Sequence, residues 1–137
     1  MERVLGIDYG ERRIGLALSD PLGVTAQPLA TLPCRKTTVV REVAEVARAR
    51  QAARLVIGLP KHMHGAEGDK AAEARAFGDA LAATTGLPVE YVDERLTTAA
   101  VQRMLAETNM SGGKKRAVVD KLAAALILQT WLDRRKS

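Results

Sequence analysis

Acidic residues stand at three places inside otherwise apolar stretches of this 137-residue sequence. Asp8 ends the apolar run 4–7, Asp93 and Glu94 end a second run, and Asp120 interrupts AVVDKLAAALILQTWL. Carboxylates at the carboxyl ends of strands meet in the crevice where open α/β sheets bind ligands. There they repel one another and lose hydration, and Mg²⁺ or Mn²⁺ relieves both costs because these cations prefer oxygen ligands. Since such cations clamp a phosphodiester and activate water, the pattern predicts metal-dependent phosphodiester chemistry.

Each of these acids also has a purely structural interpretation. Asp8 could accept hydrogen bonds from the turn YGERR, and Asp93 could pair with Arg95. Asp120 could favour the positive end of its helix. The combination is more specific than any single member, because every one of these acids interrupts an apolar element.

The charge balance of the chain favours a polyanionic partner, most simply nucleic acid. Lys and Arg total 21 against 16 for Asp and Glu, which gives a net charge of +5. Aromatic residues make up only 3% of the chain, which argues against single-strand binding by base stacking. The candidate phosphate-binding residues are Arg12, Arg13, Lys61, Arg95, Lys114 and Lys115. A solvated helix start is the alternative for the basic stretch KKR, and we expect the terminal DRRKS to be a solvated end.

The cysteine, the histidines and the apolar runs of the chain exclude several classes of protein and of metal site. The lone cysteine, Cys34, excludes an internal disulfide or a cysteine-rich zinc site and favours a reducing cytoplasm. His62 and His64 are weak evidence for a metal, because no further nitrogen or sulfur ligand accompanies them. We find no signal peptide and no apolar run long enough to cross a bilayer, and therefore expect a cytoplasmic protein without a membrane partner.

The strands and helices that position these residues are predicted from the spacing of apolar residues and from turn residues. Strands are predicted over 3–8, 13–19, 24–32, 54–60 and 89–96. Pro28 makes the third of them an edge or irregular strand. Helices are predicted over about 38–51, 69–85, 97–107 and 117–134, with a basic glycine-containing loop over 108–116. This order predicts an α/β fold: an antiparallel three-strand meander followed by parallel strands in one mixed sheet, with helices on both faces, in one domain over residues 1–137.

Four segments, in order along nearly the whole chain, carry a family resemblance. LGIDYGERRIGLALSD, VIGLPKHMHGAEG, YVDERLTT and VDKLAAALILQTWLD resemble the YqgF family, the RuvX-like bacterial proteins described as pre-16S rRNA nucleases and candidate Holliday junction resolvases. The resemblance implies a ribonuclease H-like fold and a nuclease that uses Mg²⁺ or Mn²⁺ on an RNA precursor or branched DNA. It places the catalytic, metal-binding acids on Asp8, Glu94 and Asp120. One departure is His62, where many relatives are expected to have Asn, and it concerns only the loop.

The choice between Asp93 and Glu94 is not decided by periodicity. Successive strand residues point to opposite faces, so one of the two is expected to reach the site. Val89, Tyr91 and Val92 place apolar groups on both faces. The resemblance and the longer side chain favour Glu94, with Asp93 left to stabilise the following turn or to cap the next helix.

Two other functions remain open at this point. GIDYGERRIGLALSD also resembles the first phosphate loop of sugar kinases and actin-like ATPases, although those enzymes hold nucleotide between two such domains. A non-catalytic nucleic-acid-binding module would explain the basic charge but not the three acids.

A junction resolvase must cut two strands symmetrically, which would require a homodimer with two-fold symmetry.

Overall fold

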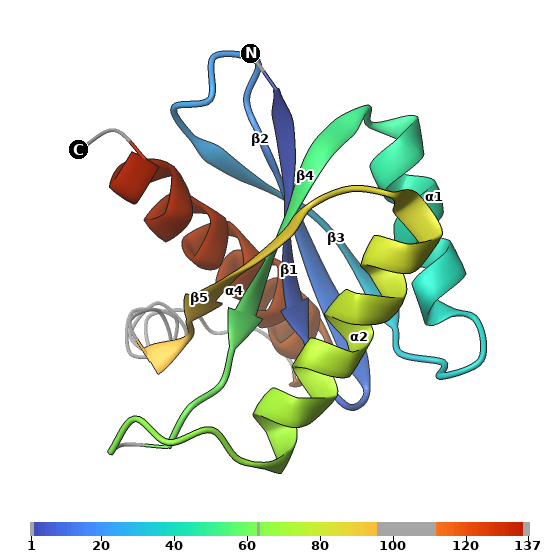
Figure 1. The fold of residues 1–137 in the computed structure, drawn as a ribbon, viewed down its shortest axis with the longest axis vertical. Coiled ribbons are helices and arrows are strands. Elements are labelled where there is room, and N and C mark those ends of the chain that lie inside the picture. The colour runs from blue at the N-terminus through green and yellow to red at the C-terminus, as the bar shows by residue number, and fades with distance from the viewer. Residues whose placement is uncertain (1, 63, 96–111, 136–137) are drawn as a thin grey trace.

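A five-stranded mixed sheet forms the centre of the protein. The computed structural model describes residues 2–62, 64–95 and 112–135 (Figure 1). The elements are β1 (Arg3–Tyr9), β2 (Arg13–Ser19), β3 (Ala26–Pro33), α1 (Val39–Ala49), β4 (Ala52–Leu59), α2 (Asp69–Thr85), β5 (Val89–Asp93) and α4 (Gly112–Arg135). The strand order is β3-β2-β1-β4-β5. β1, β2 and β3 pair antiparallel, whereas β4 pairs parallel to β1 and β5 parallel to β4. The predicted meander followed by parallel strands is confirmed.

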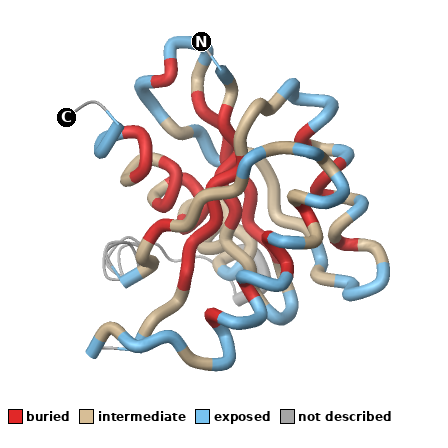
Figure 2. Tube along the Cα trace, viewed as in Figure 1, coloured by how far each residue is buried: buried red, intermediate tan, exposed pale blue. Residues whose placement is uncertain are grey.

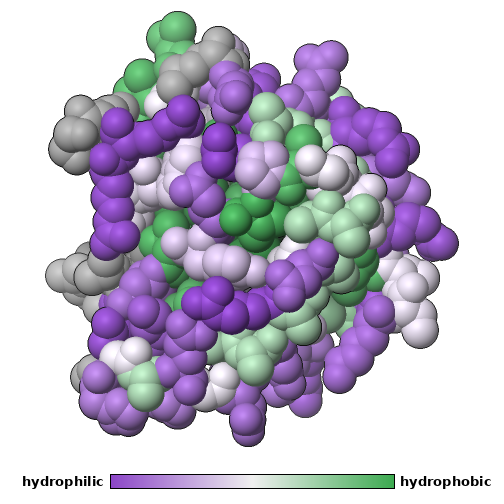
Figure 3. Space-filling model, in the orientation of Figure 1, coloured by the Kyte–Doolittle hydropathy of each residue, from purple (hydrophilic) through white to green (hydrophobic). Residues whose placement is uncertain are grey.

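Helices cover both faces of this sheet, as predicted. α1 and α2 lie against one face and α4 crosses the other (Figure 1). Residues of β1 alternate between the two cores: Leu5 and Ile7 pack on the α1/α2 side, and Val4 packs on the α4 side. The central strands are therefore buried on both faces, while the outer sides of α1 and α2 are exposed (Figure 2). Much of the surface on the α1/α2 side is accordingly hydrophilic (Figure 3).

Proline explains the irregular edge of the sheet. Pro28 lies in β3, the edge strand, where a missing backbone N–H is tolerated. The pairing register of β2 with β3 shifts between Leu16 and Ala17, which puts Pro28 opposite Ala17. The expectation of an edge or irregular strand is thus confirmed.

Glycines let α4 approach the sheet unusually closely. A Cβ added at Gly15 would lie only 1.9 Å from the main-chain oxygen of Asp120, and one at Gly6 would lie 2.7 Å from Cβ of Leu128. At Gly58 an added Cβ would lie 2.4 Å from a methyl carbon of Ile127. Because these three glycines have no side chain, α4 packs directly against the sheet at these positions. Gly15 in particular sets the distance of Asp120 from β2.

Two predicted boundaries differ from the structure by three residues or more, and those of the other described elements by no more than two. α4 begins at Gly112, so Lys115 and Arg116 lie in its first turns and not in a loop. Glycine weakens a helix, but the burial of Ala124, Ile127 and Leu128 stabilises a helix of 24 residues. β5 ends at Asp93, before the predicted end of that strand. The helix predicted over 97–107 lies outside the described residues, and within the described ranges no helix is long and apolar enough to span a membrane.

Candidate active site

The strand register places Asp8 and Glu94 on the α4 side of the sheet. Along β1, Asp8 has the same orientation as Val4, which packs against α4. In the pairing of β4 with β5, Val92 lies beside Gly58 and belongs to the α4 core. Glu94 follows two residues later, and its Cγ lies 3.8 Å from the position of a Cβ on Gly58. Both carboxylates therefore meet at the carboxyl ends of the parallel strands.

Asp8 and Glu94 lie close enough to share a hydrogen bond between their side chains. Two carboxyl groups can form such a bond only when one of them carries a proton. Burial, the negative charge of Glu94 and, to a smaller extent, that of Asp120 raise the pKa of Asp8 from 3.8 to about 8. The site thus holds more negative charge than its surroundings stabilise, and it retains a proton at neutral pH.

Asp120 approaches this pair from α4 and is bound to an arginine of β2. Its Oδ2 accepts a hydrogen bond from Nε of Arg13 at 2.6 Å, and the Asp120 side chain is only 16% exposed. The residue lies eight positions after Gly112, well beyond the first turn of α4. The helix dipole acts mainly within the first turn, so it does not account for an acid at this position. The partner of Asp120 in this structure is Arg13.

Asp93 points away from the acids and stabilises the turn after β5. It lies opposite Leu59, whose side chain packs against α2. Its Oδ2 accepts a hydrogen bond from Nε of Arg95 at 2.9 Å, and its Oδ1 accepts one from the Arg95 backbone N–H at 3.0 Å. These hydrogen bonds lower the pKa of Asp93. The structural interpretation considered for Asp93, pairing with Arg95, is what the structure contains.

A cleft of about 400 Å³ opens beside the two central acids. Its lining comprises Asp8, Tyr9, Gly10, Glu11, Pro60, Lys70, Glu73 and Glu94. Lys70 and Glu73, from the first two turns of α2, were not among the predicted site residues. The available signal was topological: the helix that follows a parallel strand begins at the ligand-binding edge of the sheet. Lys70 brings a positive charge to a cleft that is otherwise acidic.

The predicted phosphate-binding residues are placed unevenly around this site. Arg12 is exposed in the turn between β1 and β2, whereas Arg13 contacts Asp120. Lys61 lines a neighbouring cavity of about 430 Å³ together with Lys70. Arg95 contacts Asp93, Lys115 is half-buried in α4, and the side chain of Lys114 lies outside the described residues. The structure therefore brings Arg13 to the acids directly and leaves Arg12 open to solvent.

The described residues do not form a complete metal centre. Within the described ranges, no three His, Cys, Asp or Glu side chains are grouped so that they could hold a metal ion. Asp8 and Glu94 are in contact, but Asp120 is engaged by Arg13. His62 and His64 stack on one another, with ring centroids 5.4 Å apart. The oxygen donors suit a hard cation, and the two adjacent carboxylates are its best anchoring point.

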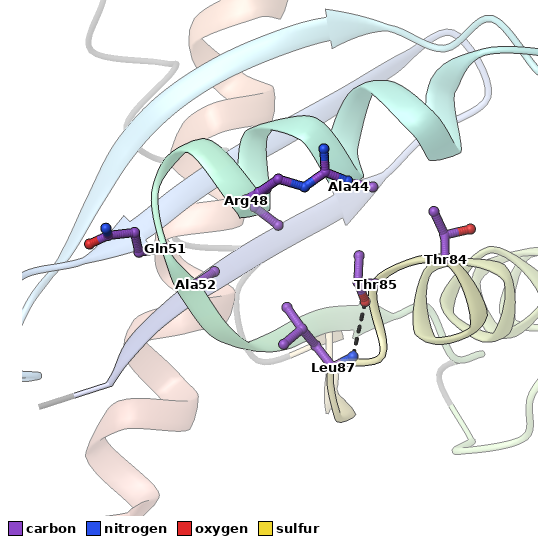
Figure 4. Close-up of a pocket in the computed structure, with 8 residues that line it drawn as sticks. Ala44, Arg48, Gln51, Ala52, Thr84, Thr85 and Leu87 are labelled. Atoms are coloured by element: carbon purple, nitrogen blue, oxygen red, sulfur yellow. Dashed lines mark hydrogen bonds between the residues drawn. The ribbon is translucent and has the colours of Figure 1, made fainter.

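A different cavity, of about 290 Å³, lies between the carboxyl ends of α1 and α2 (Figure 4). Arg48, Gln51 and Thr84 contribute its polar groups, and Thr85 accepts a hydrogen bond from the Leu87 backbone N–H at 3.1 Å. This cavity lies near the start of β4, so it is at the opposite end of the sheet from the acids. It contains none of the predicted site residues.

Comparisons with known proteins agree with this architecture. A family model described as RuvX, Holliday junction resolvase, matches residues 2–134. A protein of Symbiobacterium thermophilum named "Putative pre-16S rRNA nuclease" is 46% identical over 136 residues, which cover 97% of this chain and 93% of that protein. One of Pelotomaculum thermopropionicum with the same name is 43% identical over 133 residues, covering 96% and 86%.

Solved structures show the same fold at much lower sequence identity. Thermus thermophilus RuvC in complex with a Holliday junction substrate superimposes with a TM-score of 0.62 at 17% identity, covering 100% of this chain and 98% of that chain. At this identity the likeness establishes only the ribonuclease H-like, RuvC-like fold. The family follows from the match of its model to nearly the whole chain and from the closer relatives: the chain belongs to the RuvX (YqgF) family.

Proposed function

We propose that this chain is a divalent-metal-dependent nuclease that hydrolyses phosphodiester bonds of structured nucleic acid. Pre-16S rRNA is the favoured substrate because relatives 43–46% identical carry that name, and branched DNA is the second candidate. The observation that supports the proposal is the hydrogen-bonded pair of Asp8 and Glu94 at the carboxyl ends of β1 and β5. We further propose that residues 1–137 form one nuclease domain.

The acidic pair fits a hard dication such as Mg²⁺ or Mn²⁺. The raised pKa of Asp8, about 8, reflects unfavourable negative charge that a proton relieves in this structure. A bound dication would relieve the same charge more completely, with Asp8 and Glu94 as its ligands. Asp120 is the third proposed ligand, and it would have to exchange Arg13 for the cation. A cation held there would stabilise charge on the phosphate and activate the attacking water.

The surrounding residues of this chain would bind and orient the substrate. Arg12, in an exposed turn beside the cleft, is suited to a phosphate contact, and Arg13 becomes available for one when Asp120 turns away. Lys70 lines the cleft, and Lys61 lines the neighbouring cavity that also contains Lys70. These positive groups would hold a phosphodiester over the carboxylates. Lys114, Lys115 and Arg95 are proposed as further contacts to the strand.

A cleavage panel tests this function. Wild-type protein is incubated with labelled pre-16S rRNA fragments, linear duplexes and four-way junctions, with Mg²⁺, Mn²⁺ or EDTA. We expect cleavage that disappears with EDTA and returns when Mn²⁺ is added in excess. Undiminished cleavage in EDTA would contradict the metal dependence. Tight binding without cleavage under every condition would instead indicate a non-catalytic binding module.

A further inference from the structure

The carboxyl end of α4 is held against β4 through a tryptophan stacked with arginines. The guanidinium carbon of Arg135 lies 4.8 Å from the Trp131 ring centroid, and that of Arg54 lies 5.8 Å from it. Trp131 itself is only 9% exposed. We call Arg54, Trp131 and Arg135 the tryptophan–arginine cluster. The described residues 133–135 are exposed, as expected of a solvated end, and Arg135 in addition packs on the ring in the last turn of α4.

Among the described residues, Arg54 and Arg135 give the cluster a positive charge that Glu90 offsets only in part. It borders a cavity of about 380 Å³ whose charged lining residues are Arg54, Glu90, Arg134 and Arg135. Glu90 accepts a hydrogen bond from Nη1 of Arg54 at 2.7 Å and is the one acid among these residues. Nε of Arg54 is buried and has no hydrogen-bond acceptor among the described residues. The two guanidinium groups of the cluster, with Glu90 as the carboxylate beside them, favour an anionic ligand over this surface.

The helix dipole explains part of this arrangement but not all of it. Basic residues in the last turn of a helix are stabilised by the partial negative charge of that end, which accounts for Arg134 and Arg135. It does not account for Arg54, which belongs to β4 and converges on the same ring from the sheet. Arginines that stack on an aromatic face still have guanidinium edges available for phosphate oxygens.

The register of the sheet relates the cluster to the acidic site. Arg54 pairs with Val4 and Glu90 pairs with Val56, and both valines face α4. The cluster and Glu94 therefore lie on the same side of the sheet. Glu90 precedes Glu94 by four residues, or about 13 Å at the rise of a strand. That distance corresponds to the rise of about four base pairs along the axis of a duplex.

We propose that the tryptophan–arginine cluster binds backbone phosphates of the nucleic-acid substrate about four base pairs along the duplex axis from the bond that is cut. This inference rests on the proposed nuclease function and extends its binding surface away from the acids. Arg135 is the main ligand of the phosphate oxygens, Arg54 adds positive charge from the sheet, and Trp131 packs against both guanidinium groups. The recognised chemistry is the phosphodiester backbone, so the cluster adds affinity and not base specificity.

The test measures binding without cleavage. Labelled DNA and RNA duplexes of about 16 base pairs are titrated with protein in EDTA over a series of salt concentrations. For Arg135→Ala we expect an affinity about three- to tenfold weaker near 0.1 M salt and a log–log salt slope shallower by about 0.9, the loss of one phosphate contact. Arg135→Gln, which keeps part of the side chain over the ring, should give the same slope change. Melting temperatures of all variants confirm that they are folded.

A matched control distinguishes the loss of a phosphate contact at the cluster from the loss of one positive charge elsewhere on the protein. Arg50→Ala removes the same charge from an exposed position after α1, on the opposite face of the sheet. It should leave the slope unchanged. If both Arg135 variants also bind with the wild-type slope, the cluster does not contact the backbone, although the proposed nuclease function would stand. A wild-type chain that binds neither duplex would also overturn the role of the cluster, whereas the cleavage panel with pre-16S rRNA fragments and four-way junctions decides the proposed function.

Discussion

Replacing Asp8 with asparagine should stabilise the protein while it removes activity. The wild-type carboxyl has a pKa raised from 3.8 to about 8, mainly by burial and then by Glu94. The folded state therefore binds a proton more tightly than the unfolded state does. This contribution to stability is fully present below pH 3.8, declines as the pH rises from there to about 8, and is lost above that value. Asparagine keeps the shape of the side chain and carries no charge at any pH.

The size of the expected stabilisation follows from the shift in the pKa of Asp8. At about 1.36 kcal/mol for each pKa unit, the penalty on the folded wild-type protein at pH 7 is at most about 4 kcal/mol. Solvent in the cleft screens part of the charge, so we expect Asp8→Asn to raise the free energy of unfolding by about 1–3 kcal/mol. For a chain of this length that is an increase in melting temperature of about 3–10 °C.

The assay is thermal unfolding in EDTA at pH 5, 7 and 9. The difference between Asp8→Asn and wild type should be smallest at pH 5 and grow as the pH rises toward 8. Asp79→Asn, an exposed residue of α2, serves as the control and should show no such trend. If Asp8→Asn were less stable than wild type at pH 9, or the difference did not depend on pH, the repulsion inferred at the acidic pair would be refuted.

Further substitutions test other parts of the site. Gly15→Ala should lower the free energy of unfolding by about 3 kcal/mol or more, because the new Cβ would overlap the Asp120 carbonyl; a wild-type melting temperature would show that α4 can move away. Glu94→Gln should abolish cleavage with little change in melting temperature, while Asp93→Asn should lower the melting temperature and keep most of the cleavage rate; the reverse pattern would reassign the acid. Asp120→Asn should also abolish cleavage in a folded protein, and normal cleavage would leave Asp120 only as the partner of Arg13.

The order of strands and helices could be predicted from the sequence, and so could the unusual positions of the acids in apolar segments. Apolar runs with turn residues between them determine the strands and helices, because each run buries a face that water would otherwise contact. The order of these elements then determines the sheet topology. Asp8 could be identified as unusual because it ends a strand whose preceding residues are buried on both faces. All of this depends on local patterns.

What the sequence could not reveal depends on contacts between distant segments. The pairing of Arg13 with Asp120 joins residues 107 positions apart, and no local pattern encodes it. Tyr91 and Val92 are both apolar, so the sequence does not show which face of β5 each of them occupies. In the structure Tyr91 packs against α2 and Val92 packs against α4. The packing of Arg54 on Trp131 is another tertiary contact, because it joins β4 to α4 and no local pattern suggests it.

Proton release on metal binding tests the central claim most directly. Saturating Mn²⁺ is added to the weakly buffered protein at pH 7, and the protons released for each chain are counted with a pH indicator. Because Asp8 retains a proton up to about pH 8, a cation that takes the place of this proton should release about one proton from wild type and almost none from Asp8→Asn. Equal release from both proteins, or none from wild type at saturating Mn²⁺, would contradict a metal site at Asp8 and Glu94.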